Sequence, residues 1–352
     1  MPYGVAMVRA DAHGRVNLMG EHTDYNLGLV LPTLVPQRTQ LTLEARPDDL
    51  VRIRTDAFGD ASYRLGQEKR SGDWSDYAAA CTATLRASGF TIRGFDAEVR
   101  SDVPVGAGLS SSAAFLVALL RALREAFALS FDDTTLALAA QRAEVEFVGA
   151  RVGIMDQLAA SLGRLGEALR IDTADLAVDR VPIPTGIAFV VIDSGVRHAH
   201  AGGDYNRRRA ECEEAARLLG VASLRNVRDL NALDRLPAVL ARRARHVLNE
   251  NERVREAATA LSGGDVERLG ALFDASHASQ RDDFDVSVPE VDALAEALRH
   301  AGAFGARLTG GGFGGSVVAV ARIGSEREIA ASACHAYERR TGRAGRVIVP
   351  PR

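Results

Sequence analysis

Hydrophobic and polar residues follow a strand-like pattern in the first hundred residues. The segments 29–35 and 39–45 are rich in leucine, valine and threonine, and Pro36 lies between them. We interpret them as two paired strands, because β-branched and leucine-rich runs bounded by proline are typical of hairpins. A second hairpin is expected from 50–56 and 61–67. A loop is expected over 71–76, and another strand over 95–103.

Helical spacing of apolar residues follows. Segment 110–129 is apolar nearly all round at its start, which predicts a buried helix. The next helix is expected over 134–149, with Asp132 and Asp133 as cap candidates. The second half of the chain repeats the mixture of strands and helices. The other expected helices cover 77–88, 206–219, 237–262 and 288–300.

The length of the chain bounds its domain organisation. With 352 residues and about 100–200 residues for each domain, two domains are expected. The cluster of proline and glycine at 182–186 is the best candidate seam. We therefore expect an N-terminal domain over 1–184 and a C-terminal domain over 185–352.

Composition excludes several classes of protein. Hydrophobic residues make up 47% and charged residues 25%, as in an ordinary folded protein. The net charge of −3 and the absence of a strongly basic stretch argue against a nucleic-acid partner. No apolar run reaches the roughly 20 residues that cross a bilayer, and the start shows no signal peptide. Because Cys81, Cys212 and Cys334 are scattered, we expect a cytoplasmic protein without disulfides. We also expect a monomer.

The segment 14–32 carries more polar groups than a hairpin needs. Arg15, Glu21, His22 and Asp24 lie between two apolar runs that look like buried strands. A solvated hairpin would need only the end of this segment, Asn26 to Gly28. The surplus predicts that something polar is bound there.

Two glycine-rich segments follow the same logic. In 103–120, Gly106, Gly108 and three serines precede a helix, and backbone N–H groups at a helix N-terminus suit phosphate. The alternative is a serine-capped buried helix whose glycines only turn the chain. In 308–320, glycines surround Phe313, which predicts either a tight loop against a ligand or another loop, or a simple hairpin turn.

Two acidic residues are candidates for chemistry. Asp156 sits among apolar residues at an expected helix start, where it could orient or accept a hydroxyl proton. The competing interpretation is a helix cap. Glu144 precedes it on the previous helix and suggests Mg²⁺ beside a phosphate loop, or else an exposed helix charge.

The only lysine, Lys69, restricts how a nucleotide could be bound. It fits neither the GxxxxGK[ST] loop nor the strand lysine of protein kinases. The charge of a triphosphate would have to be met by helix amides, Mg²⁺ and arginine. Arg15 is the obvious arginine.

The opening segment, the glycine–serine loop and the late glycine run, in this order, resemble the three motifs of the GHMP small-molecule kinases. The opening segment is similar, almost letter for letter, to the signature of the GHMP kinases that phosphorylate galactose. Segments 153–163, 193–215, 286–298 and 305–316 extend the resemblance over nearly the whole chain. It implies an α+β (two-layer α/β) GHMP-kinase fold: an N-terminal mixed sheet with helices, a C-terminal ferredoxin-like α+β domain, and an active site in the cleft between them.

The resemblance also implies roles for individual residues. Asp156 would face the anomeric hydroxyl as the catalytic carboxylate, with Arg15 beside it. Mg²⁺ would be held by Ser112 and Glu144. The residues implied for galactose are Glu21, His22, Thr23, Asp24, Gly153 and Tyr205. Those implied for ATP are Gly106, Ala107, Gly108, Leu109, Ser110, Ser111, Ser112 and, near the adenine, Trp74.

The implied reaction transfers the γ-phosphate of ATP to the C1 hydroxyl of α-D-galactose, giving galactose 1-phosphate and ADP at the start of the Leloir pathway. One alternative is a GHMP kinase for galacturonate, arabinose or N-acetylgalactosamine. Another is a non-enzymatic sugar sensor, although such relatives tend to lose part of the serine motif, which is whole here. His198 and His200 could suggest a metal pair, but a structural role is favoured. Ser316 replaces a cysteine common in relatives, which we expect to be harmless.

Overall fold

The computed structural model describes residues 7–197 and 201–350, so His198 and His200 lie outside the described residues. The chain forms two compact units that alternate along the sequence. The first unit runs up to Arg15 and continues with Val35–Val105 and Ser110–Gly163. The second unit comprises Val16–Leu34, Gly106–Leu109 and the chain from Arg164 onward. The domain boundary expected at residue 184 stays a prediction.

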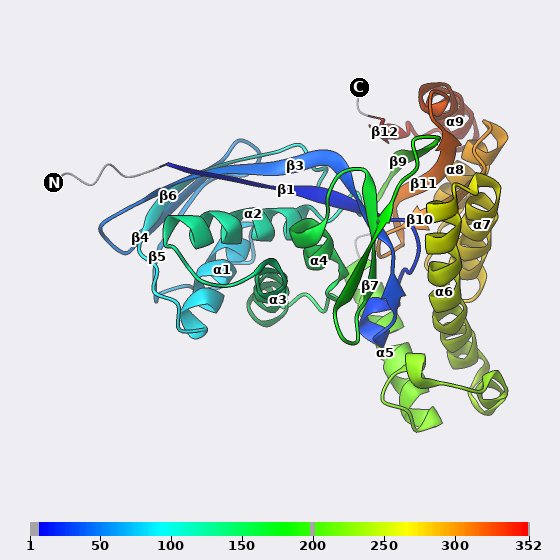
Figure 1. Ribbon diagram of the computed structural model, residues 1–352, viewed down its shortest axis with the longest axis horizontal. Helices are drawn as coiled ribbons and strands as arrows, with labels where there is room; N and C mark the ends of the chain where they lie inside the picture. The colour runs from blue at the N-terminus through cyan, green and yellow to red at the C-terminus, as the bar shows by residue number, and fades with distance from the viewer. Residues whose placement is uncertain (1–6, 198–200, 351–352) are drawn as a thin grey trace. The chain divides into compact units, whose positions relative to one another are not determined.

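The first unit is a mixed sheet covered by helices on one face (Figure 1). Its strand order is β1-β3-β6-β4-β5, in which β4 pairs parallel with β6 and antiparallel with β5. The strands are β1 (Val8–Asn17), β3 (Pro32–Ala45), β4 (Leu50–Thr55), β5 (Gly59–Arg64) and β6 (Phe95–Ser101). The helices are α1 (Ser75–Ala87), α2 (Ser111–Ala126), α3 (Asp133–Arg142) and α4 (Met155–Leu162). The expected hairpin of β4 and β5 and the helix over 77–88 are confirmed.

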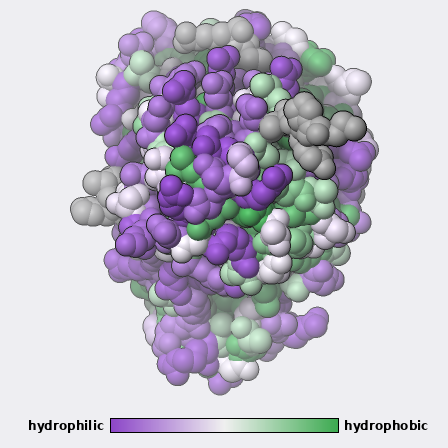
Figure 2. Space-filling model, turned by 90° about the vertical axis from the view of Figure 1, so that its left-hand side faces the viewer, coloured by the Kyte–Doolittle hydropathy of each residue, from purple (hydrophilic) through white to green (hydrophobic). Residues whose placement is uncertain are grey.

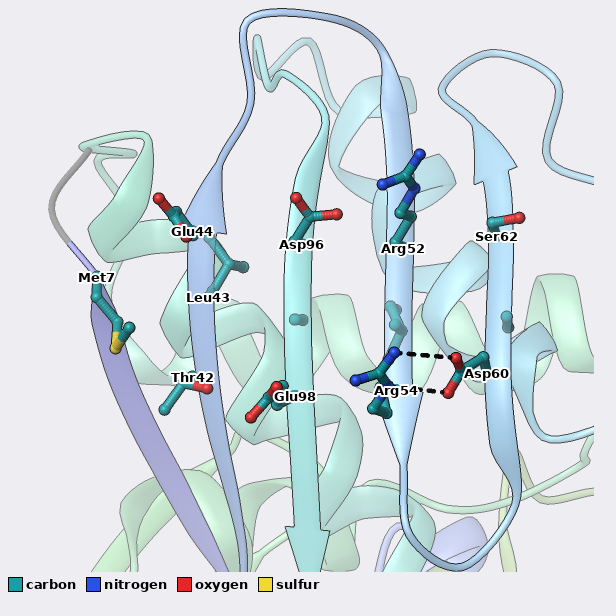
Figure 3. A pocket seen from close by; sticks show the side chains of 13 residues that line it. Met7, Thr42, Leu43, Glu44, Arg52, Arg54, Asp60, Ser62, Asp96 and Glu98 are labelled. Atoms are coloured by element: carbon teal, nitrogen blue, oxygen red, sulfur yellow. Dashed lines mark hydrogen bonds and ion pairs between the residues drawn. The ribbon is translucent and has the colours of Figure 1, made fainter. Parts of the chain in front are cut away.

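Alternation along the strands decides which face of this sheet is buried. In β4, Val51 and Ile53 are buried, whereas Arg52 and Arg54 point to the open face. On that open face, charged side chains line a shallow hollow of about 530 Å³ (Figure 3). There Arg54 bonds Asp60 at 3.2 Å. Because the hollow is built from the outward positions of ordinary strands, it is a solvated sheet face.

One expectation for the first strands is wrong. Segments 29–35 and 39–45 do not pair with each other: the short β2 (Leu29–Val30) precedes β3, a single continuous strand. Pro36 lies inside β3 at an exposed position. The ladder to β6 starts only at Thr39, so the missing N–H of Pro36 removes no hydrogen bond from it.

The helix expected over 134–149 changes type in its second half. Asp132 caps α3, since its Oδ1 accepts the Thr135 N–H at 2.7 Å. After Arg142 the chain continues as the π-helical turn η2 (Ala143–Val148). Such turns often occur at functional sites, and Glu144 lies in this one.

The second unit contains a four-stranded antiparallel sheet in the order β10-β11-β9-β12. Helices α7, α8 and α9 contact this sheet, and α6 packs on α7 (Figure 1). The expected helices over 206–219, 237–262 and 288–300 are confirmed, whereas α7 and α9 were not predicted. The sheet strands are β9 (Ile187–Arg197), β10 (Gly305–Thr309), β11 (Gly314–Arg322) and β12 (Arg346–Val349). The helices are α5 (Ala201–Leu219), α6 (Ala238–Gly263), α7 (Val266–Asp282), α8 (Pro289–His300) and α9 (Glu326–Thr341).

Smaller elements complete the second unit. β7 pairs with β2 on one side and with β8 on the other. Their bounds and those of the short helices are β7 (Glu167–Asp172), β8 (Ala177–Pro182), η1 (Asp24–Asn26), η3 (Leu224–Asn226) and η4 (Leu230–Arg235).

Polar residues predominate on one face of the molecule. On the face displayed in Figure 2, hydrophilic residues surround a smaller area where hydrophobic ones gather. Among the described residues, no helix combines the length and the apolar character needed to cross a membrane.

Two glycines let α7 and β10 meet at backbone distance. A Cβ on Gly270 would lie 2.4 Å from the carbonyl oxygen of Phe304, and one on Gly305 would lie 2.0 Å from the oxygen of Gly270. We expect Gly270→Ala to lower the free energy of unfolding by about 1–3 kcal/mol, because the added methyl group overpacks this contact. Urea unfolding measures the change.

Gly263→Ala is the matched control. Gly263 is the last residue of α6, and a Cβ there would have no neighbour within 4 Å. Alanine should be neutral there or stabilise by about 0.5–1 kcal/mol. Equal effects of the two substitutions would contradict the close contact.

Candidate functional site

In the first unit, Asp156 lies between Arg15 and Ser110. Arg15, near the end of β1, donates to Asp156 Oδ1 from Nε at 2.8 Å and from Nη2 at 2.7 Å. The Ser110 hydroxyl donates to Oδ2 of the same carboxylate. The Asp156 side chain keeps 27% exposure, and the N-terminus of α4 has no side-chain cap bond. Asp156 therefore faces a guanidinium and the serine loop, and the helix-cap alternative is wrong.

Arg121 of α2 holds the two elements that carry this pair. It donates to the Asp11 carbonyl oxygen in β1 at 2.6 Å and to the Ser161 carbonyl oxygen in α4 at 2.7 Å. One guanidinium thus fixes β1 and α4 relative to each other. The sequence analysis did not name Arg121, although a charge inside an apolar helical segment was the available signal.

Glu144 is buried beside the same loop, so the exposed-charge alternative is wrong. Its side chain accepts from Gln157 Nε2 at 2.7 Å and is hydrogen-bonded to Ser112. Glu144 is only 4% exposed, and burial raises the pKa of its carboxyl to about 7. Carboxylate and hydroxyl oxygens are the hard ligands that Mg²⁺ prefers, so these residues fit the ion. The described residues hold no cluster of three or more metal-binding His, Cys, Asp or Glu side chains.

Trp74 lies in an aromatic cavity of about 400 Å³ that also includes Ser111 and Ser112. The Phe58 ring stacks on Trp74 with centroids 6.2 Å apart, and the Phe115 ring meets it edge-on at 6.5 Å. Flat apolar walls beside serine hydroxyls suit a heterocyclic ring that carries a polar group. The first unit thus brings Trp74 together with two of the three loop serines.

In the second unit, the turn after β1 carries Glu21. Its Oε1 accepts from Thr309 Oγ1 at 3.2 Å and from the Gly310 N–H at 3.0 Å. Its Oε2 accepts from Arg307. Burial raises the pKa of the Glu21 carboxyl, against the opposing effect of the Arg307 charge. Both oxygens are therefore held by β10 and the glycine run.

His22 and Thr23 shape the same turn. His22 has a φ of +62° and is buried, and burial lowers the pKa of its ring to about 3. Its Nε2–H donates to the Gly311 carbonyl oxygen at 3.2 Å, so Nδ1 accepts from the Tyr25 hydroxyl at 2.8 Å. The Thr23 hydroxyl lies 2.6 Å from the carbonyl oxygen of Leu29. Both side chains face protein partners.

Asp24 and Tyr205 keep accessible surface. The Asp24 Oδ1 accepts the Tyr25 N–H at 2.9 Å. The Tyr205 ring packs against His22, with centroids 5.2 Å apart, and against Tyr25 at 5.7 Å. Asp24 and Tyr205 thus lie beside the same tyrosine, half-buried, and can offer oxygen atoms to a ligand.

The two glycine-rich segments meet within the second unit. A Cβ on Gly108 would lie 3.2 Å from the Thr309 carbonyl oxygen, and one on Gly310 would lie 3.1 Å from the Gly108 oxygen. Ser316 Oγ donates to the Ala107 carbonyl oxygen at 2.7 Å. The late glycine run is both the hairpin between β10 and β11 and a loop packed against another loop. The Ser316 hydroxyl takes part in that packing.

The remaining candidates occupy the borders of these groups. Leu109 is buried, and Ser110 adopts the left-handed conformation with a φ of +59° as α2 begins. Gly153 is buried in the loop that leads into α4. Two residues that hold these groups were not predicted, Arg121 in the first unit and Arg307 in the second.

Comparison with known proteins identifies the class. The profile of the GHMP kinases N terminal domain matches residues 76–164, and that of the GHMP kinases C terminal domain matches residues 255–340. The mevalonate kinase of Methanococcus jannaschii shares the fold, with a TM-score of 0.71 at 16% identity over 99% of this chain and 98% of that one. The fold and its glycine–serine loop are those of a GHMP kinase.

Closer relatives narrow the class. The galactokinase galactose-binding signature matches residues 2–44. The galactokinase of Chloroflexus aggregans is 44% identical over 346 residues, covering 95% of this chain and 89% of that protein. The galactokinase of Lactococcus lactis, solved in complex with galactose, superposes with a TM-score of 0.92 at 30% identity, over 97% of this chain and 92% of that one. The chain belongs to the galactokinase family.

The raised pKa of Glu144 has a consequence for stability. Between its ordinary value of 4.5 and about 7, the folded protein keeps a proton that the unfolded chain releases, so stability falls as pH rises through this window. Without divalent metal, we expect the free energy of unfolding of the unmodified protein to fall by about 1–3 kcal/mol more than that of Glu144→Gln between pH 4.5 and pH 7. Urea unfolding at several pH values measures the difference.

Glu146→Gln is the control, because Glu146 lies two residues further along in η2 and its side chain is 61% exposed. Its pH profile should run parallel to that of the unmodified protein. A Glu144→Gln profile that is also parallel would show that folding does not raise the pKa of Glu144.

Proposed function

We propose that the chain is an ATP-dependent galactokinase, transferring the γ-phosphate of ATP to the C1 hydroxyl of α-D-galactose to give galactose 1-phosphate and ADP. Membership of the galactokinase family supports the substrates. The observation that carries the chemistry is the Asp156 carboxylate held between Arg15 and the serine loop.

Asp156 accepts the proton of the C1 hydroxyl or holds that hydroxyl in line for the transfer. Phosphoryl transfer depends more on alignment and charge neutralisation than on covalent chemistry by the protein. Arg15 contacts Oδ1, whereas Oδ2 accepts from the short and rotatable Ser110 hydroxyl, so Oδ2 is the oxygen that we assign to the sugar hydroxyl. The guanidinium also stabilises negative charge that develops on the reacting oxygen.

The nucleotide binds through backbone groups and an aromatic cavity. The N–H groups from Gly106 to Ser112 at the start of α2 suit the phosphates. The 400 Å³ cavity with Trp74 suits the base. Ser112 and Glu144 would hold Mg²⁺, which neutralises phosphate charge when bound. Glu144 must be ionised to do so, and its pKa of about 7 makes Mg²⁺ binding stronger as pH rises through neutrality.

The sugar binds to the turn in the second unit. Each sugar hydroxyl that is withdrawn from water needs a hydrogen-bond partner. Asp24 and Tyr205 supply accessible oxygens, and Glu21, His22 and Thr23 form the turn that presents them. Gly153, which the resemblance assigns to the sugar, is buried in the loop before α4.

We further propose a cytoplasmic location. Cys81, Cys212 and Cys334 are all free, and the first two are buried. Free, scattered thiols are typical of proteins in a reducing compartment.

Replacing Asp156 tests its role. Asp156→Ala should lower kcat by a factor of about 10² to 10⁴, the usual contribution of a positioned acid–base group, while ATP affinity changes less than twofold. Steady-state kinetics and calorimetric ATP binding measure the two quantities. Asp179→Asn, which alters an exposed ion pair with Arg170, should leave both unchanged. Near-normal turnover in Asp156→Ala would remove Asp156 from the mechanism.

A coupled ADP assay with Mg²⁺ across galactose, glucose, galactosamine and galacturonate tests the substrate. Galactose should give a kcat/KM at least about a hundredfold above glucose, because a misplaced hydroxyl leaves buried polar groups unpaired. A preference for galacturonate would indicate a different GHMP sugar kinase. ADP formation with none of the sugars would favour the sensor.

A further inference from the structure

Helix α6 bonds the backbone of the sugar turn at three places. Glu250 Oε1 accepts the Gly20 N–H at 3.0 Å, and Asn251 Oδ1 accepts the Leu29 N–H at 2.7 Å. His246 Nε2–H donates to the Glu21 carbonyl oxygen at 3.2 Å. His246 and Glu250 are one helical turn apart, so they project from the same face of α6. The turn is therefore attached to a long helix on both sides of Glu21.

Glu250 also belongs to a buried ionic cluster with Arg307 of β10. Both side chains are fully buried, with Arg307 Nη2 lying 3.4 Å from Glu250 Oε1. The same Nη2 donates to the Glu21 carboxylate. The other Arg307 nitrogens donate to the Asn17 carbonyl oxygen at 3.0 Å and to Ser276 Oγ at 3.1 Å. One guanidinium thus fixes the strand before the turn, the carboxylate inside it and the helix behind it.

The charges of this cluster offset one another. Burial alone would raise the pKa of Glu250, but Arg253, whose Nε donates to Oε2 at 2.6 Å, and Arg307 outweigh burial and hold it well below its usual value. The Arg307 guanidinium also donates to the Glu21 carboxylate. Two carboxylates and the Arg307 guanidinium are therefore held together away from water, and the partly exposed Arg253 adds a second positive charge.

Such a cluster is a poor way to gain stability. Replacing buried ion pairs by apolar side chains of similar size is often neutral or stabilising, because desolvation offsets the attraction. What an apolar cluster could not do is fix the direction of the Glu21 oxygens. The neighbouring position 20 cannot supply a side chain to do so, because a Cβ on Gly20 would lie 2.5 Å from the Leu29 carbonyl oxygen.

We propose that Glu250 and Arg307 are positioning residues of the galactose site, which act through Glu21 and the Gly20 N–H to hold the sugar turn in its binding shape. This inference rests on the proposed function. Neither residue touches the sugar, and neither belongs to the segments that recognise ATP.

The test compares galactose recognition with ATP recognition in the full chain. Arg307→Lys keeps the charge but loses the fork, and Glu250→Gln keeps the shape but loses the charge. Each should raise the galactose KM at least about tenfold while the ATP KM stays within twofold. Calorimetric galactose binding should weaken by the same factor. Thermal unfolding is recorded for each variant.

Tyr337→Phe is the matched control. Tyr337 is a fully buried residue of the same unit whose hydroxyl donates to the Ser194 carbonyl oxygen at 2.9 Å, away from the turn. Its loss should lower the unfolding temperature without changing the galactose KM. Combining Arg307→Lys with Glu21→Gln should raise the galactose KM by less than the product of the single effects, because both substitutions break one contact.

Two outcomes overturn the proposal. One is a lowered unfolding temperature in Arg307→Lys and Glu250→Gln with a galactose KM within twofold of the unmodified protein. If neither variant folds, Ser276→Ala decides, since Ser276 accepts from Arg307 and donates to Glu250 at 2.7 Å. An unchanged galactose KM there overturns the proposal, and a selective rise of at least threefold supports it. Failure of the proposed function is separate, because it would appear as no turnover of galactose by the unmodified chain.

Discussion

The proposed chemistry depends on the ion pair of Arg15 with Asp156 in the first unit. A carboxylate that handles a hydroxyl proton close to phosphate charge needs a fixed cation. In the proposed mechanism Arg15 meets this need from β1, and Arg121 anchors β1 and α4 by their carbonyl oxygens. The carboxylate keeps part of its surface accessible, so it is held in place without being enclosed.

The other two candidate carboxylates are held differently. Glu21 is enclosed and shares Arg307 with Glu250. Glu144 is enclosed with neutral partners, Ser112 and Gln157, and its pKa rises to about 7. The surroundings of these three carboxylates therefore differ. Asp156 faces solvent and a guanidinium, Glu21 is fixed as part of a turn, and Glu144 is buried among neutral partners.

Local sequence patterns were enough to predict the class of the protein, but not the residues that hold its candidate side chains in place. The glycine–serine loop, the turn from Glu21 to Asp24 and Asp156 were found because each lies in a short, distinctive run of residues. The hairpin of β4 and β5 and helices α1, α5, α6 and α8 followed from periodicity. Two strands were expected where β3 is one, because proline normally ends a strand. Pro36 does not end β3, since it lies at an exposed position before the ladder to β6 starts at Thr39.

The missed residues act over long separations. Glu250 and Arg307 meet the turn from more than two hundred positions away in sequence, and no spacing rule connects them. α7 was missed although it has local signals: Gly264 has a φ of +71° at the end of α6, and Asp265 caps the next helix by accepting the Arg268 N–H at 2.9 Å. The sequence segment Gly263–Asp265 could have indicated it.

The alternation of the two units along the chain bears on biosynthesis. The chain passes from one unit to the other after Arg15 and again before Ser110, inside two of the motifs. Residues 16–34 emerge from the ribosome early, yet they bond α6 and β10, which are made more than two hundred residues later. This apolar-flanked turn must wait unpaired while the first unit forms, which makes the nascent chain a client for chaperones during that interval.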